Sequence, residues 1–429
     1  MSNRQTARHA TIAVLSVLLC GLGSVLARAE PVALLLWRHQ TGNEEVQANL
    51  DAIARFNAAQ DRWRIEVELL PQASYTQSIT AAALAGRLPC ILDLDQPVVP
   101  TFVWAGLLRP LRPHVPGKIL AAVVPSARGT YKGRIYSIGQ FDVALALFTR
   151  RSIIDAVGVR IPSLDSPWSL AEFEAVLVKI KAQGAFRYPL SLNTNPQNVA
   201  DWWTYAFSPM LQSFGGDLID QNNMWQAEGV LNGPAAIAWG QWFQSLFARG
   251  YVHRHEPDDQ AFQQQRVALA YSGSWYTDDY ARIYGEDLLV LPPPDLGHGT
   301  KIGAGSWQWA ISRTCPHPDG AGQFIAFLMQ AEEIAAISQA TGLVPVTEAS
   351  AALTRHYRPG GDWRLFYEMM VRYGQQRPPT PAFTFISSTF YKAARDIADG
   401  ANVRDALDDA VDIIEMNIAD NKGYGFPRP

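Results

Sequence analysis

The segment from Ala268 to Tyr280, ALAYSGSWYTDDY, brings together residue types that could carry chemistry. Its apolar beginning is typical of a buried strand, and two serines, a glycine and a tryptophan follow where that strand would end. A nucleophilic serine would account for the hydroxyl groups, and an aromatic surface that binds a polar molecule would account for Trp275. A packed turn of the core would account for both. The rest of the sequence has to separate these three interpretations.

Motifs of nucleophilic, metal-dependent and nucleotide chemistry are missing from the sequence. There is no G-x-S-x-G elbow, the spacing that lifts a serine onto a strained turn. No S-x-x-K, C-x-x-C, H-E-x-x-H or G-x-x-x-x-G-K-[ST] motif occurs. Gly303-Ala304-Gly305 begins a dinucleotide fingerprint, but the third glycine is absent and Trp307 would obstruct a pyrophosphate. The sequence therefore predicts no cofactor.

One metal-like cluster occurs in the segment YVHRHEPDDQ. It contains His253, His255, Glu256, Asp258 and Asp259. Two histidines one residue apart could bind a metal from an extended segment. The segment lies between helical stretches and is rich in charge, which favours a solvated loop. We therefore expect no functional metal here.

Paired carboxylates leave one route to catalysis open. Glycosidases use two carboxyl groups whose separation is defined in space and not along the chain. The candidates are Asp93, Asp95, Asp142, Asp217 and Asp278. Asp217 follows two glycines, so a turn explains it equally well. An exported carbohydrate-active hydrolase is therefore the main alternative to a binding function, and a structural or adhesive surface protein is a third hypothesis.

The elements that must position these residues alternate between strands and helices in the first part of the chain. Repeated β-α-β units predict a mostly parallel sheet with helices on both faces. Ligands of such sheets bind beyond the carboxyl ends of the strands, which directs attention to residues 38–40 and 95–96. The expected strands are 32–37, 65–70 and 90–94, and the expected helices are 44–60 and 74–84.

After residue 142 the pattern becomes more helical. Ser169-Leu170-Ala171-Glu172 is a capping box that begins an amphipathic helix, and a tryptophan-rich helical stretch continues to Ala248. Two α/β lobes with more than one chain crossing account for this order most simply. The further expected strands are 143–148, 267–271, 288–291 and 307–311, and the further expected helices are 324–339 and, with a proline-rich break at 377–381, 348–421.

The N-terminus has the anatomy of a secretory signal peptide. Arg4 and Arg8 precede a run of about 15 apolar and small residues, shorter than the ~18 to 20 residues of a membrane span. Ala27-Arg28-Ala29 fits an A-x-A cleavage site. We expect cleavage after Ala29 and export of a soluble mature chain. Lipid attachment at Cys20 is the alternative, but the residue before it is a leucine, where a lipobox has a small residue.

The composition of the remaining chain narrows the range of partners. Without residues 1–29 the chain keeps 33 basic and 40 acidic residues, a net charge of −7. No long basic run remains, which argues against nucleic acid and anionic membranes. All 13 tryptophans remain, and such flat side chains fill cores and also form sugar sites. For Cys90 and Cys315 we expect two buried free thiols, with a disulfide as the alternative in an oxidising compartment.

Seven stretches in order along the chain resemble family-1 extracellular solute-binding proteins of ABC importers, the maltose-type sugar-binding group. At Phe148-Thr149 the chain departs from the Tyr-Asn or Tyr-Asp of the family, which weakens any transfer of ligand identity. The stretches are ILDLDQPVVPTFVWAGLLRPL (91–111), YKGRIYSIGQFDVALALF (131–148), DSPWSLAEFEAVLVKIKAQG (165–184), FGGDLID (214–220), VALAYSGSWY (267–276), GAGSWQWAIS (303–312) and TGLVPVTEASAAL (341–353).

The resemblance implies a two-lobed periplasmic binding protein fold of type II, with a mostly parallel sheet in each lobe. It implies crossings near Phe141, Gly303 and Ala349. It also implies a monomer that closes over a sugar by hinge motion and delivers it unchanged to permease subunits in the inner membrane. No metal, cofactor or nucleic acid takes part. The implied lobes are 30–141 with 304–349 and 142–303 with 350–429.

The implied sugar site draws on both lobes. Trp275 and Trp307 would supply aromatic faces, and Ser274 would supply hydrogen bonds. Gly273 would let the main chain approach the ligand. Asp95, one step past a buried strand, would accept hydrogen bonds from two sugar hydroxyls. The other expected site residues are His39, Glu44, Gln96, Asp142, Trp203, Gly305, Ser306 and Arg377.

Some of these residues also have a structural explanation: a core aromatic for Trp275 and Trp307, a helix cap or turn residue for Asp95, a favourable charge at a helix N-terminus for Glu44 and a plain surface position for Arg377. Trp202, the neighbour of Trp203, is expected in the core. Arg377 and His39 leave room for an acidic or phosphorylated sugar.

Overall fold

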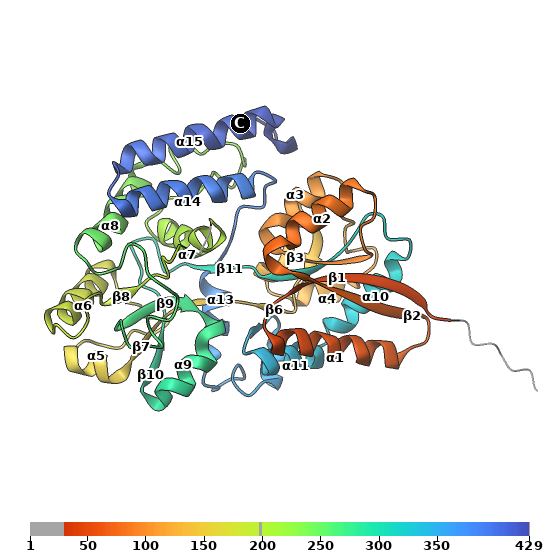
Figure 1. Ribbon diagram of the computed structural model, residues 1–429, viewed down its shortest axis with the longest axis horizontal. Coiled ribbons are helices and arrows are strands. Elements are labelled where there is room, and N and C mark those ends of the chain that lie inside the picture. The colour runs from red at the N-terminus through yellow and green to blue at the C-terminus, as the bar shows by residue number, and fades with distance from the viewer. Residues whose placement is uncertain (1–29, 197–199, 429) are drawn as a thin grey trace, which may run out of the picture.

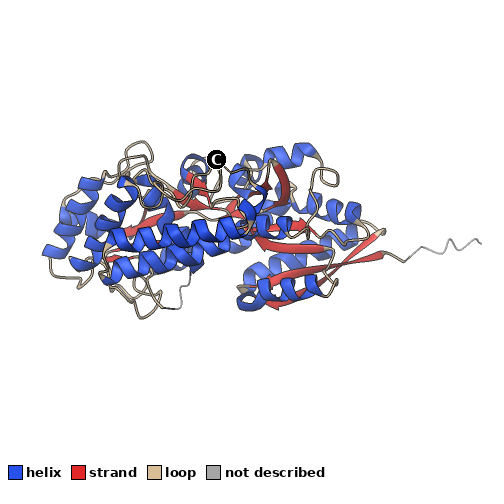
Figure 2. Ribbon diagram, turned by 90° about the horizontal axis from the view of Figure 1, so that it is seen from above, coloured by secondary structure: helices blue, strands red, loops and turns tan. Residues whose placement is uncertain are grey.

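The computed structural model describes residues 30–196 and 200–428, and the expected signal peptide lies outside this part of the chain. The described chain forms two α/β lobes, each built on a sheet of its own (Figure 1). The strands of both lobes lie among helices when the molecule is seen from above (Figure 2). The apolar side chains form separate cores in the two lobes.

The first lobe contains a six-stranded sheet of order β2-β1-β3-β12-β5-β4. Its strands are β1 (Val32–Gln40), β2 (Trp63–Pro71), β3 (Ile91–Asp95), β4 (Arg128–Tyr131), β5 (Arg134–Ile138) and β12 (Trp307–Ile311). Its helices are α1 (Asn43–Ala59), α2 (Tyr75–Leu84), α3 (Val99–Trp104), α4 (Gly117–Ala122), α10 (Pro318–Leu328) and α11 (Ala331–Thr341).

Only part of this sheet is parallel. β1 lies between β2 and β3 and runs parallel to both, as β-α-β units require. β12 runs antiparallel to β3, because the chain re-enters the lobe at the edge where β3 ends. The first residue of β12, Trp307, therefore lies opposite the last residue of β3, Asp95. The pairs β12–β5 and β4–β5 are also antiparallel, so the prediction of a mostly parallel sheet is wrong in this half.

The second lobe contains a four-stranded sheet of order β10-β7-β9-β8. Only the β8–β9 pair is parallel, so the predicted parallel sheet is wrong here too. Its strands are β7 (Leu145–Arg150), β8 (Leu190–Ser191), β9 (Leu269–Gly273) and β10 (Leu288–Leu291). The helices of this part are α5 (Arg151–Val157), α6 (Leu170–Ala182), α7 (Ala200–Ser213), α8 (Pro234–Ala248), α9 (Thr277–Tyr284), α12 (Glu348–Leu353), α13 (Arg364–Tyr373), α14 (Phe383–Asp399) and α15 (Val403–Asp420).

The direction of β7 explains this arrangement. The chain leaves the first lobe, enters the second at Leu145 and runs along β7 away from the junction of the lobes. β9 returns in the opposite direction and ends at Gly273, which pairs with Leu145. The end of β9 therefore lies next to the junction, as the end of β3 does in the first lobe.

Short strands mark where the chain passes between the lobes. β6 (Phe141–Asp142) connects β5 to β7 and pairs with β13 (Val344–Pro345), which leads out of the first lobe again. β11 (Ile302–Ala304) precedes β12 and pairs with β14 (Gly374–Gln376). Figure 1 shows β6 and β11 between the two lobes.

Two local predictions differ from the structure. Cys90 and Cys315 form a disulfide that joins the start of β3 to the loop after β12, so the prediction of free thiols is wrong. Their Cα atoms are 4.4 Å apart, because Ser312, after the end of β12, donates its backbone N–H to the carbonyl oxygen of Cys90 at 3.0 Å, and a turn brings the N–H of Cys315 to the carbonyl oxygen of Ser312 at 3.3 Å. The single helix predicted over 324–339 is two helices, α10 and α11. The side-chain amide of Gln140 donates to the carbonyl oxygen of Leu328 at 2.8 Å, at the end of α10.

Candidate functional site

A cleft with a volume of about 370 Å³ lies at the junction of the lobes. This volume falls within the range of about 300 to 1,000 Å³ that is usual for small-molecule sites. The ends of β1, β3 and β9, the start of β12 and one face of α7 reach it. Its lining residues are His39, Thr41, Glu45, Gln72, Asp95, Phe141, Val143, Asp201, Trp202, Tyr205, Trp275, Gly305, Ser306, Trp307, Leu343 and Arg377.

Trp307 forms the aromatic surface of the first-lobe wall. The ring of Trp307 stacks on the imidazole of His39, with 3.5 Å between centroids and 16° between planes. Nδ1 of His39 lies 2.6 Å from a carboxylate oxygen of Asp93. The ring of Tyr75 contacts Trp307 edge-on at 5.8 Å. These contacts hold the indole from behind, so that its position is defined before any ligand arrives.

A second set of charged groups lies behind this wall. Arg38 is 1% exposed, and its guanidinium is hydrogen-bonded to the carboxylate of Glu45, which lines the cleft. Burial raises the pKa of Glu45, while the charge of Arg38 opposes that shift. Arg38 also lies 3.9 Å from the carboxylate of Asp93. The buried cation thus balances two carboxylates that approach the cleft.

Asp95 and Arg377 form an ion pair inside the cleft. Two guanidinium nitrogens of Arg377 lie 3.3 and 3.5 Å from the two carboxylate oxygens of Asp95. Arg377 also donates to the carbonyl oxygen of Gly305 at 3.2 Å and lies 5.3 Å from the ring centre of Tyr205. Its side chain is 6% exposed and that of Asp95 is 26% exposed. Because Arg377 is the more buried partner and is already paired, a solute in the cleft meets the carboxylate oxygens of Asp95 rather than a free cation.

Three aromatic rings form the second-lobe wall. The ring of Trp275 contacts Trp202 edge-on at 6.2 Å and Tyr205 at 6.3 Å, and it is 37% exposed. Tyr205 is 6% exposed, and its hydroxyl donates to the carbonyl oxygen of Val143 at 3.4 Å. Burial raises the pKa of this hydroxyl well above its usual value. Partly exposed flat rings of this kind stack on apolar faces of polar molecules.

The segment Ser272–Trp275 adopts a packed turn that presents an aromatic ring. A Cβ atom on Gly273 would lie 2.0 to 2.3 Å from atoms of the Trp275 ring, so the indole folds back over the glycine. The prediction that Gly273 brings the main chain to a ligand is therefore wrong: its open space is filled by the neighbouring ring. Ser274 is buried, and its backbone N–H donates to the carbonyl oxygen of Ala144 at 2.9 Å. This hydrogen bond connects the residue after β9 to the segment between β6 and β7, where the chain enters the second lobe.

A smaller cavity of about 310 Å³ continues the cleft beyond Trp275. It shares Thr41, Glu45, Trp275 and Leu343 with the cleft. The charged residues lining the two cavities together are Glu44, Glu45, Asp95, Asp201, Asp278, Asp279, Arg282 and Arg377. Both of the arginines are paired with carboxylates, Arg377 with Asp95 and Arg282 with Asp279 at 3.0 Å. The combined groove is therefore rich in negative charge.

The structure brings most of the expected site residues to this groove. Among the described residues, His39, Asp95, Trp275, Gly305, Ser306, Trp307 and Arg377 line the cleft, and Glu44 lines the smaller cavity. Gln96 lies behind Gly305 with its side chain fully buried. Asp142, Trp203, Gly273 and Ser274 also lie outside the lining.

Asp142 belongs to the junction of the lobes instead. It is fully buried, and one carboxylate oxygen accepts hydrogen bonds from the backbone N–H groups of Val143 at 2.7 Å and Gly305 at 2.9 Å. Burial raises its pKa from 3.8 to about 6, against the lowering effect of these hydrogen bonds. The side chain thus ties the first crossing to the second.

The expected roles of the two adjacent tryptophans are exchanged. Trp203 is fully buried in the second-lobe core, where its ring packs on Phe207 at 5.0 Å. Trp202, expected in the core, lines the cleft together with Tyr205. Residues three positions apart lie on one face of a helix, so the pair Trp202 and Tyr205 was a signal of a shared face. The pattern alone does not say which face of α7 meets the core.

Other carboxylates of the sequence have structural partners. Asp93 is bound to His39, and Asp217 accepts from the backbone N–H of Leu218 at 2.7 Å in the second lobe. Glu256, in the metal-like segment, is buried and accepts from Ser191 at 2.5 Å. Within the described ranges, no group of three or more potential metal ligands is placed to hold a metal.

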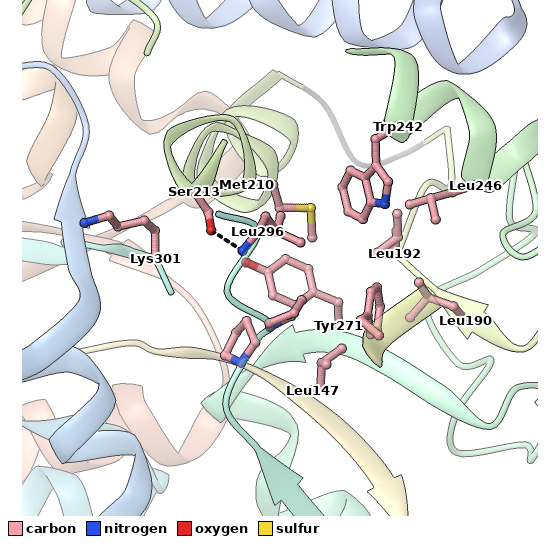
Figure 3. Close-up of a pocket in the computed structure, with 13 residues that line it drawn as sticks. Leu147, Leu190, Leu192, Met210, Ser213, Trp242, Leu246, Tyr271, Leu296 and Lys301 are labelled. Carbon is pink, nitrogen blue, oxygen red and sulfur yellow. Dashed lines mark hydrogen bonds between the residues drawn. The ribbon is translucent and has the colours of Figure 1, made fainter. Parts of the chain in front are cut away.

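An enclosed apolar cavity in the second lobe is separate from the cleft (Figure 3). Figure 3 shows the ring of Tyr271 among Leu147, Met210 and Leu296. The cavity has a volume of about 20 Å³, and one water requires about 10 to 15 Å³ by the same measure. It is a packing defect of the core and is too small for a solute.

Two α/β lobes joined by chain crossings, with a polar, aromatic cleft between them, define the class of two-lobed solute receptors. The chain belongs to the bacterial extracellular solute-binding proteins, because the model of that family matches residues 51–358. The membership in a solute-binding family that the sequence motifs indicated is thereby confirmed, and the protein is exported. No helix in the described part of the chain is long and apolar enough to cross a membrane.

Similar proteins support this assignment. An "uncharacterized lipoprotein in oleD 5′ region" of Streptomyces antibioticus is 22% identical over 78% of this chain and 75% of its own length. The crystal structure of the cyclic alpha-maltosyl-1,6-maltose binding protein of Arthrobacter globiformis has a TM-score of 0.79 at 21% identity, over 91% of this chain and all of that chain. The sugar-binding protein MalE of Xanthomonas citri has a TM-score of 0.75 at 18% identity, over 91% and 98%. The two-lobed fold is therefore confirmed.

Proposed function

We propose that this chain captures a sugar in the cleft between its lobes and delivers it unchanged to the permease of an ABC importer. The observation that carries the proposal is the cleft itself, in which aromatic rings from both lobes flank the Asp95–Arg377 pair. A sugar has faces of C–H groups and edges of hydroxyls. It therefore suits flat rings combined with fixed charged hydrogen-bonding groups.

The ligands of structural neighbours support a sugar. The GacH receptor of Streptomyces glaucescens GLA.O, described in complex with acarbose, has a TM-score of 0.74 at 18% identity over 92% of this chain and 100% of that chain. The Arthrobacter globiformis protein is described as binding a cyclic maltosyl-maltose. The smaller cavity beside Trp275 gives this chain a groove longer than one compact pocket. This supports an oligosaccharide over a monosaccharide.

The charge of the groove supports a neutral or amine-bearing sugar. Carboxylates outnumber guanidinium groups along it, and Arg282 and Arg377 are already paired. The acidic or phosphorylated sugar that the sequence left open is therefore disfavoured.

A ligand screen tests the proposal. Thermal shifts with neutral oligosaccharides, amino sugars, uronic acids and polyols should identify binders, and calorimetry should give their dissociation constants. We expect a neutral or amine-bearing oligosaccharide to raise the melting temperature. Trp275→Ala should weaken binding by ~2.5 kcal/mol, the value of about 100 Å² of lost apolar contact at ~25 cal/mol per Å². Trp104→Ala is the matched control, since Trp104 is 49% exposed and lies outside the cleft.

The same incubation separates binding from hydrolysis. A transport receptor returns the sugar chemically intact, whereas a carbohydrate-active hydrolase releases new reducing ends. Appearance of reducing ends at a rate that depends on Asp95 would reject the transport proposal. Absence of any thermal shift or heat across the panel would reject a sugar as the ligand.

The proposal includes the cellular setting of the chain. Cleavage after Ala29 would release a monomer into the periplasm, where it would shuttle between solute and inner-membrane permease. The lobes, 30–141 with 304–349 and 142–303 with 350–429, would close on the sugar by rotation about the crossings. Ligand shifts such an equilibrium only if the closed form contacts it from both sides, which the two aromatic walls support. Mass spectrometry of the exported protein tests the cleavage site.

A further inference from the structure

We propose that Glu256 is a positioning residue of the cleft, which acts through residues 191–194 on the aromatic wall formed by Trp202 and Trp275. This inference rests on the proposed sugar-binding function. Glu256 lines no part of the cleft and belongs to the segment YVHRHEPDDQ, whose chemistry the fold had left unexplained.

The carboxylate of Glu256 organises the backbone that follows β8. One oxygen accepts from the hydroxyl of Ser191 at 2.5 Å. The other oxygen accepts from the backbone N–H groups of Leu192 at 3.0 Å and Thr194 at 3.3 Å. The side chain of Thr194 in turn donates to the carbonyl oxygen of His253 at 2.8 Å. A single buried carboxylate thus satisfies donors that have left the sheet and would otherwise be orphaned.

This loop holds the first tryptophan of the wall directly. The indole N–H of Trp202 donates to the carbonyl oxygen of Leu192 at 3.3 Å. The N–H of Leu192 is one of the groups that Glu256 binds. The N–H and C=O groups of Leu192 therefore connect the carboxylate of Glu256 to the indole of Trp202. Displacement of Leu192 would move the acceptor that orients Trp202.

The loop also touches the strand that ends at the second tryptophan. The side-chain amide of Asn193 donates to the hydroxyl of Ser272 at 3.3 Å, three residues before Trp275. Trp202 and Trp275 contact each other edge-on at 6.2 Å. Residues 191–194 therefore contact both Trp202 and the strand that ends at Trp275, and Glu256 holds these residues through hydrogen bonds.

The Glu256 carboxylate acts as the acceptor in each of its hydrogen bonds to residues 191–194. Glu256 is 3% exposed, and its burial raises its pKa against the lowering effect of the hydrogen bonds from Ser191, Thr194 and Leu192. In Glu256→Gln the amide oxygen can still accept from the backbone N–H groups of Leu192 and Thr194, but the charge is lost and the amide nitrogen, a donor, faces the Ser191 hydroxyl, which must then act as the acceptor. The shape of the side chain remains while the network loses an acceptor.

The experiment measures sugar affinity beside stability in the whole exported protein, with the tightest oligosaccharide of the screen as the probe. Glu256→Gln should raise the dissociation constant by about tenfold. This is the size expected when one charge-assisted hydrogen bond that fixes the Trp202 ring is lost. Asp217→Asn is the matched control. Asp217 lies in the same lobe but does not line the cleft. Its carboxylate also accepts a backbone N–H, and burial raises its pKa. Asp217→Asn should lower the melting temperature without changing the dissociation constant.

A double-mutant cycle distinguishes positioning from general destabilisation. Trp202→Phe removes the indole N–H, so that Glu256→Gln should cost clearly less affinity in the Trp202→Phe protein than in the wild type. Ser191→Ala provides a milder variant if Glu256→Gln does not fold, and it should show the same coupling at smaller size. Unchanged affinity in Glu256→Gln, or equal losses in both backgrounds, would overturn the inference while the sugar-binding function stands. If no sugar binds the wild type, the proposed function itself fails.

Discussion

Removal of the Cys90–Cys315 disulfide should destabilise the first lobe and leave ligand affinity unchanged. The two cysteines are 225 residues apart in sequence. In the chain-entropy model, release of a loop of this length costs about 5 kcal/mol at 25 °C. That figure is an upper limit, because the loop contains most of the second lobe. If the second lobe stays folded while the first unfolds, the freed chain is shorter and the loss is smaller.

The bond lies at the end of the sheet that faces away from the cleft. Cys90 precedes β3, whose other end is the cleft residue Asp95. Ile91 and Ile311 remain paired in the sheet after the bond is removed. The position of Trp307, four residues before Ile311 on β12, should therefore persist in the variant.

The assay compares the protein beginning at Glu30 with its Cys90→Ser/Cys315→Ser variant. Guanidinium unfolding followed by tryptophan fluorescence should show a lower midpoint for the variant, and calorimetry should give the same dissociation constant for the sugar. Thiol titration should find no free thiol in the native protein and two after unfolding in a reductant. Two free thiols in the native protein, or a stability loss below ~1 kcal/mol, would refute the reasoning.

Three further outcomes follow from the geometry of the cleft and the junction. The pKa of Asp142 is raised to about 6, so between pH ~4 and ~6 the folded protein holds a proton that the unfolded chain has released, and its stability should fall as pH rises. Asp142→Asn should remove about 3 kcal/mol of that dependence, which urea unfolding at several pH values measures. Asp95→Asn leaves the buried Arg377 without its counter-charge and should cost ~2 kcal/mol of stability, less than a fully buried pair since Asp95 is partly exposed; an unchanged urea midpoint would contradict this. Gly273→Ala should displace the Trp275 ring, which calorimetry would detect as weaker sugar binding and fluorescence as a shifted emission.

Much of the local structure could be predicted because it depends on short-range patterns. The capping box at Ser169 begins α6 as expected, with the Ser169 hydroxyl accepting from the N–H of Glu172 at 3.3 Å. The buried strand 90–94 and the position of Asp95 at its end also follow from a run of apolar residues closed by a carboxylate. The break between α10 and α11 was not predicted, because no glycine or proline marks it at Met329 and Gln330, and Gln140, which donates to the carbonyl oxygen of Leu328 there, is remote in sequence.

The sequence by itself determined the class of this protein: an exported α/β chain with motifs of solute-binding proteins and aromatic residues at the ends of strands. These features depend on composition, periodicity and neighbours along the chain. The tertiary structure alone decided which residues meet at the cleft. Trp202 and Trp203 are adjacent and identical in type, and only the packing of α7 on the second-lobe core sends one inward and the other to the cleft. The pairing of Asp95 with Arg377, 282 positions apart, depends likewise on how the lobes are joined.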